Sequence, residues 1–86
     1  MKIGLLVNPT AGRRRAARFH AGLAGAVRRA GHLVVDLSGP DAASARVNAR
    51  THLQGLDAVI VMGGDGAVQL GLNVVAETGV PLGIIP

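Results

Sequence analysis

Four short apolar runs alternate with three longer segments of helical pattern, and this alternation constrains the fold more than any other feature. The apolar runs have the length of strands and occupy residues 2–7, 32–37, 57–62 and 81–85. The segments between them are expected to be helices at about residues 13–30, 41–53 and 67–78. Strands that alternate with helices form right-handed crossovers in a parallel sheet. The sequence therefore predicts an α/β fold, a parallel sheet with helices on both faces, and 2-1-3-4 is taken as its working strand order.

The first helical segment is expected to be amphipathic. Its apolar residues recur at spacings of three and four, at Phe19, Leu23, Val27 and Ala30. Gly31 follows as a candidate left-handed cap at the end of this helix. Asp41 is a candidate N-cap for the second helix, because its carboxylate can accept a hydrogen bond from the first turn.

The composition indicates a small packed domain with a basic surface. The chain has 86 residues, of which 49% are hydrophobic, and its nine Lys and Arg against five Asp and Glu give a net charge of +4. Much of the positive charge comes from Arg13, Arg14, Arg15, Arg18, Arg28 and Arg29. Such a cluster suits phosphates or anionic lipid, although an ordinary solvated helix face is the simpler interpretation. Nucleic acid is disfavoured as a partner, since Phe19 is the single aromatic residue available for base stacking.

No apolar run is long enough for a signal peptide or a membrane span, and cysteine is absent, so the simplest location is cytoplasmic.

Two turn-rich loops follow the first and third predicted strands. They read "NPTAG" at residues 8–12 and "GGDG" at residues 63–66, and each leads into a helix. In an open parallel sheet, ligands bind beyond the carboxyl ends of the strands where the strand order reverses, here between strands 1 and 3. Unpaired N–H groups at helix starts attract phosphate. The alternative is that the glycines only turn the chain, that Asp65 only N-caps the third helix, and that Asn8 and Thr10 only form local turns.

Asp65 suggests a divalent cation in this crevice. A carboxylate beside a polyphosphate is repulsive alone and becomes attractive when Mg²⁺ lies between them. The chain has neither a P-loop motif nor G-x-G-x-x-G in its first turn, which disfavours a P-loop NTPase and a standard dinucleotide site. A nucleoside triphosphate with Mg²⁺ is the ligand that fits best.

The segments "NPTAG", "VMGGDG" and "PLGIIP", in this order and spacing, resemble the N-terminal part of the diacylglycerol kinase catalytic domain. This family includes diacylglycerol kinases, sphingosine kinases and related lipid kinases, and the resemblance covers nearly the whole chain. It implies a truncated nucleotide-binding subdomain of the Rossmann or flavodoxin-like type, as in NAD kinases and 6-phosphofructokinases, which share the GGDG element. The chain is then residues 1–86 of a longer enzyme whose second, β-rich domain is absent.

The resemblance also implies ATP- and Mg²⁺-dependent phosphorylation of a lipid hydroxyl, such as that of diacylglycerol, at a membrane surface. The nucleotide-binding residues that it implies are Asn8, Pro9, Thr10, Ala11, Gly12, Ser38, Gly63, Gly64, Asp65, Gly66 and Ala67. Asp65 is the expected magnesium ligand, and no catalytic residue is expected in this chain, because the family's proposed base lies in the second domain. The chain departs from the family at Ala67, where threonine is usual, and at Gln69, where asparagine is usual.

The missing second domain and the open sheet lead to two further expectations, and two alternative functions stay open. The isolated chain should be inactive, because the lipid site and the base are missing. Its uncovered sheet edge should favour self-association. The alternative functions are a fragment of an NAD kinase or sugar-phosphate kinase, and a non-enzymatic flavodoxin-like domain that binds an anion.

Overall fold

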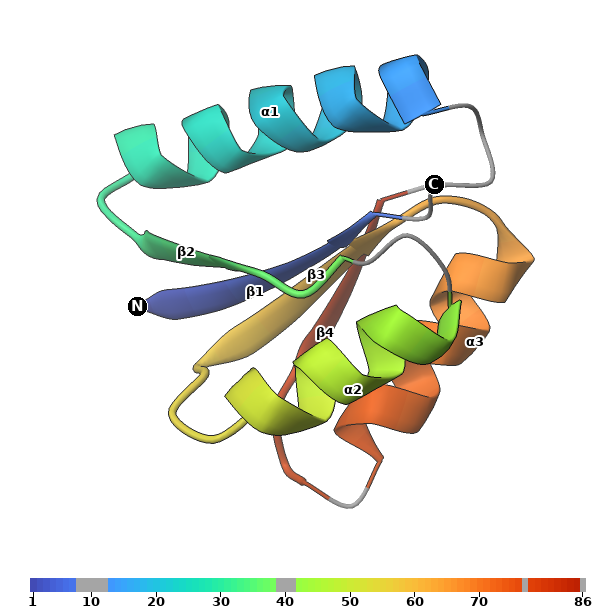
Figure 1. Ribbon diagram of the computed structural model, residues 1–86. Helices are drawn as coiled ribbons and strands as arrows, with labels where there is room; N and C mark the ends of the chain where they lie inside the picture. The colour runs from blue at the N-terminus through green and yellow to red at the C-terminus, as the bar shows by residue number, and fades with distance from the viewer. Residues whose placement is uncertain (8–12, 39–41, 77, 86) are drawn as a thin grey trace.

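The computed structural model describes residues 1–7, 13–38, 42–76 and 78–85, with the backbone alone described for residues 13–16 and 42. The elements follow one another as β1 (Lys2–Val7), α1 (Arg13–Arg29), β2 (Leu33–Asp36), α2 (Ala42–His52), β3 (Ala58–Met62), α3 (Asp65–Val75) and β4 (Leu82–Ile85). Figure 1 shows the strands forming one sheet with the helices packed against it. The predicted α/β fold is confirmed.

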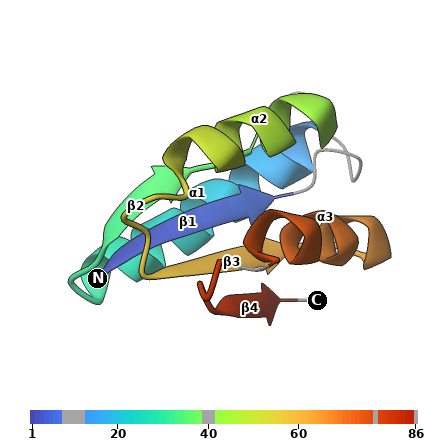
Figure 2. The ribbon, with the colours of Figure 1, turned by 90° about the horizontal axis from the view of Figure 1, so that it is seen from below.

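All strand pairs are parallel, as predicted, and the order is β2-β1-β3-β4, which agrees with the working order. α1 covers one face of the sheet, while α2 and α3 lie together over the other (Figures 1 and 2). β1 and β3 occupy the centre, and β1 is buried along its length after Lys2. Such burial on both faces explains why this strand is a continuous apolar run rather than an alternating one.

The two faces have separate cores. Under α1, the buried side chains are Ile3, Leu5, Ala24 and Val27. Under α2 and α3, the larger cluster contains Leu6, Leu37, Ala45, Ala49, Leu56, Val59, Val61, Ala67 and Val74. Successive residues of a strand point to opposite faces, so Leu5 and Leu6 enter different cores.

The apolar face of α1 differs from the prediction. Leu23 and Val27 pack as expected, but Phe19 is 45% exposed and Ala30 lies exposed beyond the helix. The buried stripe instead includes Ala24, which is 2% exposed. Residues spaced three or four apart can belong to either of two adjacent stripes along a helix. The sheet contacts the stripe that includes Ala24 as well as the predicted stripe that includes Leu23. Phe19 therefore lies at the margin of the stripe.

Helix ends follow the predicted turn chemistry in part. Gly31 has φ of 92°, the left-handed conformation expected after α1. α3 begins two residues earlier than expected and ends three residues earlier, at Val75. Thr78 explains the early end, because its N–H and its hydroxyl both donate to the Val75 carbonyl, at 3.1 and 2.7 Å. The predicted N-cap at Asp41 lies outside the described residues.

Two properties bear on the surroundings of the domain. None of the helices in the described ranges combines the length and the hydropathy needed to cross a bilayer. β4 lies at an edge of the sheet and its Ile84 is 50% exposed. Self-association through this edge stays a prediction.

Candidate nucleotide-binding site

The carboxyl ends of β1 and β3 lie side by side where the strand order reverses. Val7 ends β1 and is in register with Met62, the last residue of β3. Ser38, after β2, reaches the same row, because its Oγ accepts a hydrogen bond of 2.9 Å from the Val7 N–H. Gly63 continues from Met62 and donates its N–H to the Ile85 carbonyl of β4, at 3.2 Å. Ser38 and the GGDG turn thus flank the end of β1, roughly two strand spacings or about 10 Å apart.

The predicted residues of the first loop, Asn8, Pro9, Thr10, Ala11 and Gly12, lie outside the described residues. Their part in the site stays a prediction. The chain enters and leaves this loop at Val7 and Arg13, so the loop connects the end of β1 to the start of α1.

The first two glycines of the GGDG turn have different roles: the backbone conformation requires glycine at one position, and the other borders open space. Gly63 has φ of 145°, a conformation that residues with a side chain rarely adopt. Gly64 is the N-cap of α3 and makes no side-chain capping bond, and a Cβ built on it meets no atom within 4 Å. Its carbonyl accepts the N–H groups of Ala67 and Val68, at 3.0 and 3.1 Å. The N–H groups nearer the helix start have no intrahelical partner, so this open turn presents donors to an anion.

Asp65 is the first residue of α3, and its side chain is exposed. The alternative in which Asp65 only N-caps the helix is therefore wrong, because Gly64 occupies the capping position. A carboxylate in the first turn still interacts favourably with the helix dipole. Within the described ranges, no three His, Cys, Asp or Glu side chains gather to hold a metal. Mg²⁺ needs no such cage, since it binds through one or two carboxylates together with substrate phosphates and water.

Ala67 lies in the core rather than at the surface of the turn. Its side chain is 2% exposed and belongs to the cluster beneath α2 and α3. Its N–H already donates to Gly64. The site residue that departs from the family pattern thus contributes packing here, and a contact between Ala67 and the nucleotide stays a prediction.

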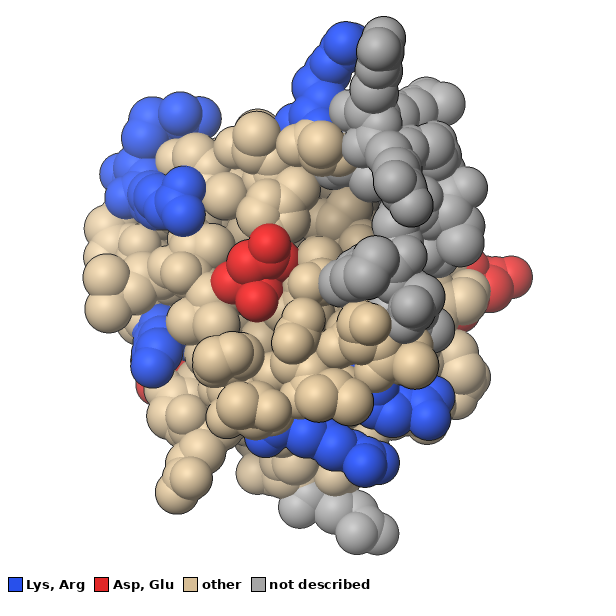
Figure 3. All heavy atoms as spheres, in the orientation of Figure 1, with Lys and Arg blue, Asp and Glu red and all other residues tan. Residues whose placement is uncertain are grey.

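The basic side chains that are visible on the face shown in Figure 3 do not form one patch. Arg18, Arg28 and Arg29 are exposed on α1, and in Figure 3 the blue groups lie apart around the rim of the face. A red acidic group lies near the middle of that view. The side chains of Arg13, Arg14 and Arg15 are not described, so a role for them in phosphate or lipid binding stays a prediction.

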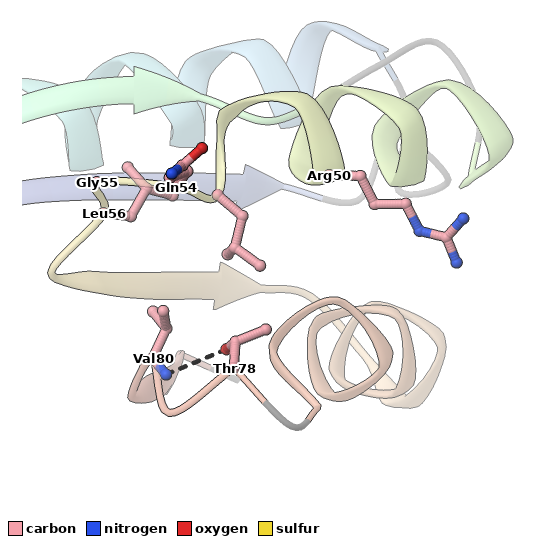
Figure 4. Close-up of a pocket in the computed structure, with 7 residues that line it drawn as sticks. Arg50, Gln54, Gly55, Leu56, Thr78 and Val80 are labelled. Carbon is pink, nitrogen blue, oxygen red and sulfur yellow. Dashed lines mark hydrogen bonds between the residues drawn. The ribbon is translucent and has the colours of Figure 1, made fainter.

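A hollow of about 380 Å³ opens at the opposite edge of the sheet. Its lining includes Arg50 of α2, Leu53 and Leu56 before β3, and Thr78 and Val80 before β4 (Figure 4). The Thr78 hydroxyl is already engaged with the backbone on both sides. This hollow lies at the amino ends of the strands, so it is separate from the crevice that the sequence predicts.

The sequence analysis did not identify two residues whose side chains form hydrogen bonds with the Ser38 backbone. Asp36 Oδ1 accepts the Ser38 N–H at 2.8 Å, and Asn48 Nδ2 donates to the Ser38 carbonyl at 3.2 Å. The first has a local signal, because an aspartate that accepts from the residue two positions on forms a common turn at a strand end. The second joins residues ten positions apart and depends on where α2 packs.

A family model and two curated relatives point to the same protein family. The model of the family described as "Diacylglycerol kinase catalytic domain" matches residues 2–86. Two curated relatives are 42% identical over 86 residues, which is 99% of this chain. They are the diacylglycerol kinases of Mycobacterium tuberculosis strains CDC 1551 / Oshkosh and ATCC 25618 / H37Rv, and the chain spans 28% of their length. By sequence and by the α/β fold that carries it, the chain belongs to the diacylglycerol kinase catalytic domain family.

Proposed function

We propose that this chain forms the nucleotide-binding part of an ATP-dependent lipid kinase. The intact protein would transfer the terminal phosphoryl group of ATP to a lipid hydroxyl, such as that of diacylglycerol, at the cytoplasmic surface of a membrane. The observation that carries the proposal is the GGDG turn, which lies open at the strand-order reversal in a chain matched by the family model over residues 2–86. The family favours a lipid substrate over the NAD and sugar-phosphate alternatives.

The residues of the turn fit a phosphate chain. Gly64 leaves open space where a side chain would obstruct an approaching anion. The N–H groups at the start of α3 carry partial positive charge, which a phosphate oxygen complements. Ser38 adds a hydroxyl on the other side of the β1 end. These groups bind and orient the phosphates, which is the larger part of what a phosphoryl-transfer enzyme contributes.

Asp65 fits a magnesium ion that is shared with the phosphates. Its carboxylate is exposed beside the turn and does not cap α3. Mg²⁺ would supply charge neutralisation between the phosphate oxygens. Asp65 would hold it, directly or through water, and would thereby tolerate the approach of a polyanion.

The direct test uses the intact protein with radiolabelled ATP, Mg²⁺ and vesicles that contain diacylglycerol. We expect label in phosphatidic acid, and its loss when the Mg²⁺ is chelated. Parallel reactions with NAD and with a sugar phosphate test the other kinase alternatives. Label transferred to NAD or to the sugar phosphate but not to lipid would refute the lipid-kinase assignment, and an absence of ATP binding would favour the non-enzymatic alternative.

A further inference from the structure

Ser38 is held from three directions, although it follows an edge strand. Its N–H donates to Asp36 Oδ1 at 2.8 Å, its carbonyl accepts from Asn48 Nδ2 at 3.2 Å, and its Oγ accepts from the Val7 N–H at 2.9 Å. The bonds come from β2, α2 and β1 respectively. A serine in a surface loop ordinarily samples several rotamers. Here the backbone on both sides of the side chain and the side chain itself are fixed.

The preceding residue anchors the same segment from the core. Leu37 is fully buried, and its N–H donates to the Leu5 carbonyl at 2.8 Å. Ser38 therefore cannot move away from the end of β1 without breaking a bond of the sheet or exposing Leu37. Its neighbour on the other side, residue 39, lies outside the described residues.

The bond from Val7 leaves the hydroxyl chemically able to act on a ligand. A serine hydroxyl has one proton to donate and two lone pairs. The Val7 N–H occupies one lone pair, so the proton stays available to an acceptor beyond the carboxyl edge of the sheet. Phosphate and ribose oxygens are acceptors of this kind. The position of the Ser38 oxygen is thus fixed, and its proton can be donated in a hydrogen bond to a bound nucleotide.

Asp36 lies close to His20. His20 of α1 places Nε2 3.1 Å from the same Oδ1 that accepts the Ser38 N–H, although these two side chains do not form a hydrogen bond. The carboxylate is 55% exposed, so it is not a buried ion that the core must neutralise. The hydrogen bond that Asp36 accepts from the Ser38 N–H shapes the turn containing Ser38.

From these contacts we infer that Asp36 and Asn48 are positioning residues that hold the Ser38 hydroxyl as a hydrogen-bond donor to the nucleotide. The inference rests on the proposed function, because it needs a nucleotide beside the β1 end. Asp36 and Asn48 act through Ser38 and do not touch the ligand. Their loss should therefore weaken nucleotide binding while leaving the rate at saturating nucleotide little changed.

The experiment measures the ATP KM and kcat of the intact protein, together with direct ATP binding, for Ser38→Ala, Asp36→Ala and Asn48→Ala. Each variant is expected to raise the KM by about three- to tenfold, the range expected for the net contribution of one ordinary hydrogen bond, with kcat within about twofold. Asp36→Asn keeps an oxygen that can accept the Ser38 N–H, so it should retain most of the wild-type KM. The double variant Asp36→Ala/Ser38→Ala should be no worse than Ser38→Ala, since there is no longer a hydroxyl to position.

Asp57 offers a matched control. Its carboxylate accepts a backbone N–H from Lys2 at 2.7 Å, but at the amino edge of the sheet. Asp57→Ala removes the same kind of bond and should leave the ATP KM unchanged. An unchanged KM in Asp36→Ala, or an equal rise in Asp57→Ala, would overturn the inference while leaving the proposed function intact. Wild-type protein that binds no ATP would overturn both.

Discussion

Replacing Asp65 with asparagine in the intact protein distinguishes a role of this carboxylate in binding Mg²⁺ from a role in the stability of the fold. The side chain is exposed at the first residue of α3 and makes no capping bond that the change could break. The folded state therefore loses only the favourable interaction of the carboxylate with the helix dipole, about 0.3–1 kcal/mol in the free energy of unfolding. Asparagine is nearly isosteric, so the turn should keep its shape.

The expected effect on activity is larger than the effect on stability. We expect kcat/KM for ATP to fall well over tenfold, which corresponds to more than about 1.4 kcal/mol of transition-state stabilisation. If the loss comes from weaker magnesium binding, raising the Mg²⁺ concentration should recover part of it, because the weakened site then fills by mass action. A titration of initial rate against Mg²⁺ at fixed ATP measures this, and urea denaturation measures the stability.

Asp57→Asn is the control, because it makes the same change of side chain at the other edge of the sheet. The amide oxygen of the new asparagine can still accept the Lys2 N–H. It should change neither the rate nor the magnesium dependence. Wild-type kcat/KM in a folded Asp65→Asn protein would refute the reasoning, because the carboxylate would then contribute only its dipole interaction.

Three other changes test separate parts of the site. Gly63→Ala forces a side chain onto φ of 145° and should cost about 1–3 kcal/mol in the free energy of unfolding, seen in denaturant titration; unchanged stability would mean that the turn relaxes. Ala67→Thr adds a hydroxyl to a core position, so we expect about 1–3 kcal/mol of destabilisation and no gain in ATP affinity by calorimetry; tighter binding would show that the side chain reaches phosphate. If Arg13, Arg14 and Arg15 face a membrane, reversing them to glutamate should weaken binding to anionic vesicles most at low salt, whereas unchanged binding there would indicate the solvated helix face that is the simpler interpretation.

The strands and their parallel arrangement could be predicted because the sequence signal for them is local and strong. Each apolar run is bounded by turn residues, and alternation with helices leaves few topologies once crossovers are right-handed. β2 is shorter than the predicted run because its ladder with β1 spans Leu33 to Asp36. Leu37 nevertheless packs fully buried just beyond it. The Leu37 N–H also still donates to the Leu5 carbonyl, so contact with β1 extends one residue past the end of β2.

The errors at α1 and α3 share a physical cause. Apolar spacing identifies a helix face to within about one residue, so Phe19 and Ala24 could not be ranked before the sheet was in place. Similarly, a Gly-Asp pair at a helix start does not show which of Gly64 and Asp65 takes the first helical conformation. At Ala67 the sequence shows that a hydroxyl is missing, but the direction of the side chain depends on how α3 rotates against the sheet. These details are set by tertiary packing.

The two edges of the sheet use their polar groups differently, and this difference separates stability from binding. At the amino edge, Asp57 exchanges two bonds with the Lys2 backbone, both 2.7 Å long, and Thr78 bonds backbone groups on both of its sides. At the carboxyl edge, the start of α3 has no side-chain cap, Gly64 leaves open space, and Asp65 is exposed. Backbone donors are seldom left without partners in folded proteins, and those of an uncapped helix start are satisfied by water or by a ligand. Substitution of Asp57 or Thr78 at the amino edge should therefore reduce the free energy of unfolding, whereas substitution of the exposed Asp65 at the carboxyl edge should reduce the affinity for phosphate, which is the division expected of a parallel sheet that binds its ligand beyond the strand ends.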